Sequence, residues 1–171
     1  MTGYVQVYTG DGKGKTTAAL GLALRAAGAG IKVFLARFLK TGDSSELAAL
    51  DRFADLVTVR SYGRAGFIRG EPGPEDIERA RAGFAEVRDA VASGAYPLVI
   101  LDEVNVAVAL GLIAAEEVLA LIEERPGHVE LVLTGRRADE RIIARADLAT
   151  EMREVKHYFQ KGVSARKGID V

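Results

Sequence analysis

Residues 9–17, TGDGKGKTT, combine three glycines with two lysines and a pair of adjacent threonines. Glycines let the backbone adopt conformations in which successive N–H groups point inward at an anion. Lys13 and Lys15 add two positive charges, which suit a polyphosphate better than a single phosphate. A helix beginning near Lys15 would add its positive N-terminal dipole, and the Thr16 hydroxyl is placed to bind Mg²⁺. The stretch therefore predicts a phosphate-binding loop in which Lys15 contacts the phosphates.

The match to the general phosphate-loop pattern, G-x-x-x-x-G-K-[ST], is imperfect because Thr9 stands where the first glycine is expected. Gly14, Lys15 and Thr16 fill the last three positions. The alternative is a glycine-rich turn between a strand and a helix that holds no ligand. We favour the phosphate-binding role, because such a turn has no use for two lysines at a helix N-terminus.

Two further stretches carry polar residues at the end of an apolar run. Residues 98–101 (LVIL) are followed by Asp102 and Glu103, the pattern that completes a metal–nucleotide site. Either acid could hold Mg²⁺ directly or through water, and the alternative is a cap for the next segment. Arg136 follows residues 129–134 (VELVLT), at the edge where open α/β sheets bind ligands. Arg136 could bind phosphate oxygens or be a surface arginine, and its position alone does not decide between these two roles.

Strand-like runs alternate with helical patterns along the whole chain, which predicts an α/β domain with a mainly parallel sheet covered on both faces. We expect about six strands, at residues 4–8, 31–39, 56–62, 98–101, 129–134 and 148–155. Helices are expected at residues 16–28, 44–53, 74–93, 116–124 and 139–146. No repeat or linker interrupts this alternation, so we predict a single nucleotide-binding domain over residues 1–171.

Composition limits the location and the partners. The net charge of −1 argues against DNA, RNA or an acidic membrane as partner. The chain has no cysteine, which rules out disulfides and thiolate catalysis and fits the cytoplasm. No segment resembles a signal peptide or reaches about 18 apolar residues. We therefore expect a cytoplasmic protein.

Four stretches together resemble the ATP:corrinoid adenosyltransferases of the cob(I)yrinic acid a,c-diamide type. They are TGDGKGKTTAALGLALRAAG, LVILDEVN, RPGHVELVLTGR and VKHYFQKGVSARKGID, in that order, and they extend over nearly the whole chain. The resemblance implies a RecA-like fold and a homodimer. It also implies a reaction in which a Co(I) corrinoid attacks the 5′ carbon of ATP and inorganic triphosphate leaves, with Mg²⁺ or Mn²⁺ as cofactor.

The resemblance also implies roles for individual residues. It assigns Thr16 and Glu103 to the metal, Arg136 to phosphate, and Arg25 to the nucleoside side of ATP. ATP lies reversed in the loop of this family, so the loop holds the whole triphosphate as a leaving group. The residues implied in triphosphate binding are Thr9, Gly10, Asp11, Gly12, Lys13, Gly14, Lys15, Thr16 and Thr17.

Members of this family help the reduction of Co(II) by pushing apolar or aromatic groups under the cobalt, often a Phe–x–Trp pair. This chain has no tryptophan, and its corresponding loop reads GRAGFIRG. Phe67 is then the residue expected under the cobalt, with Ile68 beside it. The alternative is that Phe67 is a hydrophobic anchor for a long loop. An electron-donating reductase, such as a flavoprotein, is the implied protein partner.

The same residues leave other functions open. A phosphotransferase or ATPase would use the same loop but cut ATP at its terminal phosphate, and a sensing module would bind nucleotide or corrinoid without turnover. The tail, residues 156–167, could be a small basic and aromatic nucleic-acid patch, but we favour a segment that closes over the site. We expect His157 to be a hydrogen-bonded structural residue rather than a cobalt ligand.

Overall fold

The computed structural model describes residues 2–41, 44–64 and 71–170. Its centre is a sheet of six parallel strands in the order β3-β2-β4-β5-β1-β6. The strands are β1 (Val5–Thr9), β2 (Val33–Phe38), β3 (Val57–Tyr62), β4 (Leu98–Asp102), β5 (Glu130–Thr134) and β6 (Leu148–Glu151). The α/β class, the parallel sheet and the number of strands are confirmed.

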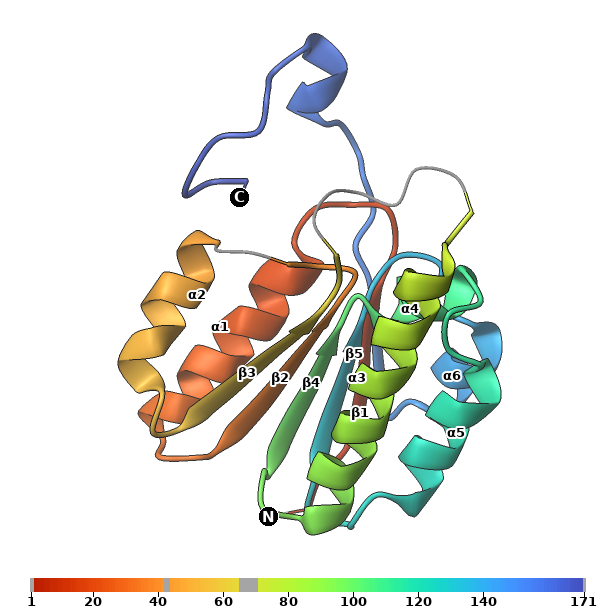
Figure 1. Cartoon of the computed structure of the whole chain (residues 1–171). Helices are drawn as coiled ribbons and strands as arrows, with labels where there is room; N and C mark the ends of the chain where they lie inside the picture. The colour runs from red at the N-terminus through yellow and green to blue at the C-terminus, as the bar shows by residue number, and fades with distance from the viewer. Residues whose placement is uncertain (1, 42–43, 65–70, 171) are drawn as a thin grey trace.

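Helices cover both faces of the sheet (Figure 1). One face carries α1 (Lys15–Gly28) and α2 (Ser45–Leu50), which continues as a 3-10 turn, η1 (Asp51–Phe53). The other face carries α3 (Pro74–Ser93), α4 (Val104–Ala109), α5 (Ala115–Glu124) and α6 (Glu140–Arg145). Within the described ranges, no helix has both the length and the apolar character needed to cross a membrane.

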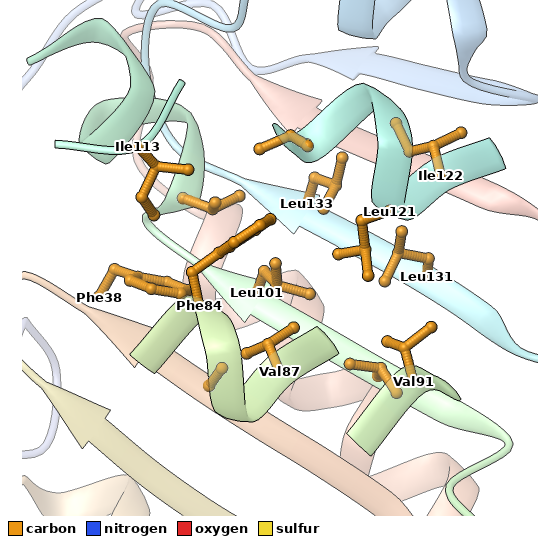
Figure 2. Packing of buried hydrophobic residues seen from close by; sticks show 14 of the residues in the cluster. Phe38, Phe84, Val87, Val91, Leu101, Ile113, Leu121, Ile122, Leu131 and Leu133 are labelled. Carbon is orange, nitrogen blue, oxygen red and sulfur yellow. The ribbon is translucent and has the colours of Figure 1, made fainter. Parts of the chain in front are cut away.

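Two hydrophobic clusters hold these layers together. Alanines of α1, including Ala19 and Ala23, bring this helix close to the sheet. Larger side chains fill the opposite face, where Phe84 of α3 and Leu121 of α5 meet Leu101 of β4 (Figure 2). Burial of both faces explains the continuous apolar sequences of the central strands, since no residue of β2 or β4 is exposed.

The strand order determines which loops meet. Parallel strands have all their carboxyl ends at one edge, and β5 lies between β1 and β4. The glycine loop after β1, the acids at the end of β4 and Thr134 at the end of β5 therefore gather at the same edge.

The observed elements differ most from the expected ones at three places. The helix α4 was not expected; it begins directly after Glu103, whose φ of 63° turns the chain out of the sheet. The strand β6 ends at Glu151 rather than at residue 155, because the chain then crosses the glycine loop. A short 3-10 helix, η2 (Tyr158–Lys161), interrupts the tail.

Candidate active site

The glycine loop joins β1 to α1 and wraps around the side chain of Lys15. This side chain is buried, and its Nζ donates hydrogen bonds to the carbonyl oxygens of Gly10 at 2.6 Å and Gly12 at 2.7 Å. Gly10 and Gly14 have φ values of 92° and 124°, which favour glycine. Burial lowers the pKa of the Lys15 ammonium, and the nearby charge of Arg136 lowers it further. An anion that approaches the loop would therefore stabilise the charged form of Lys15.

The segment after β6 packs against the loop and explains two of its glycines. The N–H of Gly12 donates to the carbonyl oxygen of Met152 at 2.6 Å, and the N–H of Met152 donates to Thr9 at 2.8 Å. A Cβ at Gly10 or Gly12 would lie 2.5 or 2.6 Å from that Met152 oxygen. Both positions therefore need glycine for the close backbone approach, and Gly10 needs it also for its positive φ.

We predict that Gly12→Ala weakens binding of inorganic triphosphate at least about tenfold, because the added Cβ forces the loop or the Met152 segment to move. Gly21→Ala in α1 is the matched control, since a Cβ there meets nothing within 4 Å and alanine favours a helix by about 0.5–1 kcal/mol. Calorimetric titration and thermal melting measure both effects. Equal affinities in the two variants would show that the close contact is not needed.

The acids at the end of β4 differ in their surroundings. The carboxylate of Asp102 is buried and accepts hydrogen bonds from the hydroxyls of Thr16 at 2.9 Å and Thr134 at 2.7 Å. Glu103 is only partly exposed, and its N–H donates to the Thr134 hydroxyl at 3.0 Å. Burial raises the pKa of the Glu103 carboxyl, and the charge of Lys40 partly opposes that rise. The structure thus places Thr16, Asp102 and Glu103 together, as the sequence predicted.

Lys40 joins this group although no sequence motif indicated it. Its Nζ lies 2.7 Å from Asp102 Oδ2, 3.0 Å from Thr16 Oγ1 and 3.8 Å from Glu103 Oε1. The residue follows β2, the neighbour of β4 in the sheet. Only the fold brings Lys40 to the loop, because 24 residues separate it from Thr16 and 62 from Asp102.

The donor atoms fit a hard divalent cation. A threonine hydroxyl and two carboxylates are oxygen ligands of the type that Mg²⁺ prefers. The described residues contain no group of three or more histidine, aspartate or glutamate side chains that could hold a metal alone. A cation at Thr16 and Glu103 would therefore need additional ligands from water and a bound phosphate, which is the usual arrangement for Mg²⁺ at nucleotides.

Thr16, Lys40 and Glu103 line a cavity of about 880 Å³ at the carboxyl edge of the sheet. Arg136, half-exposed on the cavity wall, lies 4.0 Å from the carboxylate of Asp11. Most of the expected triphosphate residues contribute to the lining: Asp11, Gly12, Lys13, Gly14, Lys15, Thr16 and Thr17. The cavity is large enough for a nucleotide-sized ligand.

The C-terminal tail forms another wall of the cavity, above the sheet edge in Figure 1. The Asp170 carboxylate accepts hydrogen bonds from the Lys13 ammonium and the Tyr158 hydroxyl, and it forms an ion pair with Arg166 at 3.0 Å. These contacts, led by that of Lys13, hold the pKa of Asp170 well below its usual range. The His157 ring accepts a hydrogen bond from the Phe159 N–H at 3.0 Å, so it has the structural contact that we expected.

Three of the expected site residues, Thr9, Gly10 and Arg25, are not among the described residues that line this cavity. Arg25 is exposed on α1, ten residues after Lys15 and about 15 Å along the helix, and it is not among the described lining residues. Phe67, like Ile68, lies outside the described residues. The roles of Arg25 and Phe67 remain predictions.

The parallel sheet, the glycine loop and the clustered acids are consistent with a nucleotide-binding domain of the P-loop type. The family model of the ATP:corrinoid adenosyltransferases BtuR/CobO/CobP matches residues 1–171. The chain belongs to this family.

Individual relatives support the same family assignment. A corrinoid adenosyltransferase of Pseudomonas aeruginosa is 37% identical over 98% of this chain and 83% of its own length. The corrinoid adenosyltransferase CobA of Salmonella typhimurium is 36% identical over 98% of this chain and 85% of its own length. An uncharacterized protein of Nostoc sp. is 39% identical over 92% of the chain, which spans only 45% of that longer protein.

Proposed function

We propose that this protein transfers the 5′-deoxyadenosyl group of ATP to the Co(I) centre of a corrinoid and releases triphosphate. The observation that carries the proposal is the loop around Lys15 next to the acids of β4, in a chain that belongs to the adenosyltransferase family. In this reaction the cobalt electron pair forms the bond to C5′. The C5′–O bond breaks, and its electrons leave with the triphosphate.

The main task of the protein is then to stabilise negative charge on the leaving triphosphate. Lys15 is held at the centre of the loop, and Lys13 and Arg136 lie on the walls of the same cavity. A divalent cation, Mg²⁺ or Mn²⁺, would be held by Thr16 and Glu103, with Asp102 orienting the Thr16 hydroxyl. When bound, it supplies further charge neutralisation to the phosphates.

Several parts of the proposal rest on the family resemblance and on composition. They are a single domain, a homodimer, a reductase such as a flavoprotein as electron donor, Arg25 at the nucleoside and Phe67 under the cobalt. A cytoplasmic location is supported by the lack of cysteine, and the net charge of −1 favours small-molecule partners over nucleic acid or membrane.

Incubation with ATP, Mg²⁺ and a chemically reduced corrinoid tests the function. We expect the absorption spectrum of a cobalt–carbon bond and one triphosphate released for each bond formed. Formation of ADP and phosphate without corrinoid would instead indicate a phosphotransferase or ATPase. Tight ATP binding without any turnover would indicate a sensing module.

We also predict that Asp170→Asn tightens ATP binding by up to about fivefold, because the Lys13 ammonium loses a competing carboxylate in an exposed ion pair. Glu154→Gln is the matched control, since Glu154 lies just before the tail and its carboxylate accepts a hydrogen bond from Gln160 rather than from Lys13. Fluorescence titration with a labelled ATP analogue measures both. Weaker binding in Asp170→Asn would mean that the tail contact helps to hold ATP rather than to compete with it.

A further inference from the structure

Lys40 stands at the point where a divalent cation would bind. Its ammonium group contacts Asp102 and Thr16 within hydrogen-bond distance and lies 3.8 Å from the carboxylate of Glu103. Thr16 and Glu103 are the two residues that we expect to hold the metal. The side chain is 27% exposed and lines the nucleotide cavity, so it can move toward a ligand there.

The backbone holds Lys40 firmly in this place. Leu39 before it has a φ of 59°, a left-handed conformation that is uncommon for leucine and that ends β2 in a sharp turn. The N–H of Gly63 donates to the carbonyl oxygen of Lys40 at 3.1 Å, and a Cβ at Gly63 would lie 2.5 Å from the Lys40 nitrogen. The turn at Leu39 and the close contact with Gly63 hold the Lys40 backbone in place. The long Lys40 side chain can still move toward a ligand.

An ammonium group and a divalent cation cannot occupy this point together. Both are positive, and Lys40 already uses one oxygen of Asp102 and the oxygen of Thr16. The Lys40 side chain must therefore leave before a metal can bind. The acceptors that the same cavity would then offer are the oxygens of a bound triphosphate, which carry more negative charge than Asp102 alone.

We propose that Lys40 is a built-in counter-cation that fills the metal position until the metal–nucleotide complex arrives and then moves to the triphosphate. It keeps the buried Asp102 charge balanced in the free protein, which lowers the cost of an empty site. It also keeps free divalent cations out, so that metal enters with ATP. In the bound state it adds a cation to the leaving group, a role that rests on the proposed function.

Metal binding to the nucleotide-free protein tests the first part of the proposal, that Lys40 keeps free divalent cations out. We expect Lys40→Met to bind free Mn²⁺ at least about tenfold tighter than the unmodified protein, measured by electron paramagnetic resonance. Lys32→Met, which removes an exposed lysine before β2, and Lys40→Arg, which keeps the charge, should bind Mn²⁺ as the unmodified protein does. If Lys40→Met melts at a clearly lower temperature than the unmodified protein, Lys40→Gln is used in its place. An unchanged Mn²⁺ affinity in the folded variant overturns the proposal.

Binding of inorganic triphosphate with Mg²⁺ tests the second part of the proposal, that Lys40 moves to the triphosphate. We expect Lys40→Met to bind it about tenfold more weakly, because a cation is lost from the phosphates. Equal affinity overturns the proposal. Neither measurement uses a corrinoid, so a failure here is distinct from a failure of adenosyl transfer itself.

Discussion

Lys15→Ala is expected to reduce adenosyl transfer from ATP about 100-fold or more, the scale on which loss of one charge-stabilising group slows a reaction. The Lys15 ammonium lies inside the loop, where few water molecules can replace it. Most of the loss should be in kcat, because charge on the triphosphate grows as the C5′–O bond breaks. Triphosphate release with a pre-reduced corrinoid measures this step without the preceding reduction.

Loop collapse must be separated from loss of charge, since Lys15 also donates hydrogen bonds to Gly10 and Gly12. Each hydrogen bond from the charged group contributes about 1.5–3 kcal/mol, partly offset by the cost of burying the ammonium, so the variant should melt lower by no more than about 10 °C. Lys13→Ala is the companion variant, because Lys13 belongs to the same loop but pairs with Asp170 at the surface. We expect its activity to fall by less than about tenfold. Full turnover by Lys15→Ala would mean that this loop does not hold the triphosphate.

The sequence predicted the fold because each central element carries a strong local signal. The strand β4 is a run of aliphatic residues that no helix period explains, and all of it is buried. The helix α1 follows a glycine loop and is rich in alanine, which allowed both its start and its close packing to be foreseen. Helix α4 was missed because its start depends on the left-handed backbone at Glu103. Such a conformation leaves no clear pattern in a non-glycine residue.

Site residues were predictable where they stand in sequence motifs and unpredictable where only the fold brings them to the site. Thr16 and the acids at the end of β4 could be paired from sequence, since loops at the carboxyl edge of a parallel sheet meet. Lys40 and Thr134 could not, because neither stands in a motif and each reaches Asp102 only through the strand order. The contact of Met152 with the loop was also missed, because it uses only backbone atoms.

The network around Asp102 connects stability with function. One buried carboxylate orders the first turn of α1 through Thr16, the end of β5 through Thr134 and the turn after β2 through Lys40. Three segments at the carboxyl edge of the sheet therefore depend on a single charge. A change there should alter the folded state and the chemistry at the same time.

Asp102→Asn is accordingly expected to destabilise the protein by about 2–3 kcal/mol, less than for a fully buried pair because Lys40 is 27% exposed. The amide keeps the shape of the side chain but turns one acceptor oxygen into a donor. At least one of its three partners, each of which donates to Asp102, then faces another donor. The melting temperature should fall by about 4–12 °C.

Activity should fall further than stability alone explains in this variant. The Thr16 hydroxyl would no longer be oriented toward the metal, and we expect about a 100-fold slower triphosphate release even in the folded protein at low temperature. Asp89→Asn on the exposed face of α3 is the control for a lost acidic charge and should change neither quantity. A variant that melts like the unmodified protein yet is inactive would restrict Asp102 to the chemistry. Normal activity with early melting would restrict it to the fold.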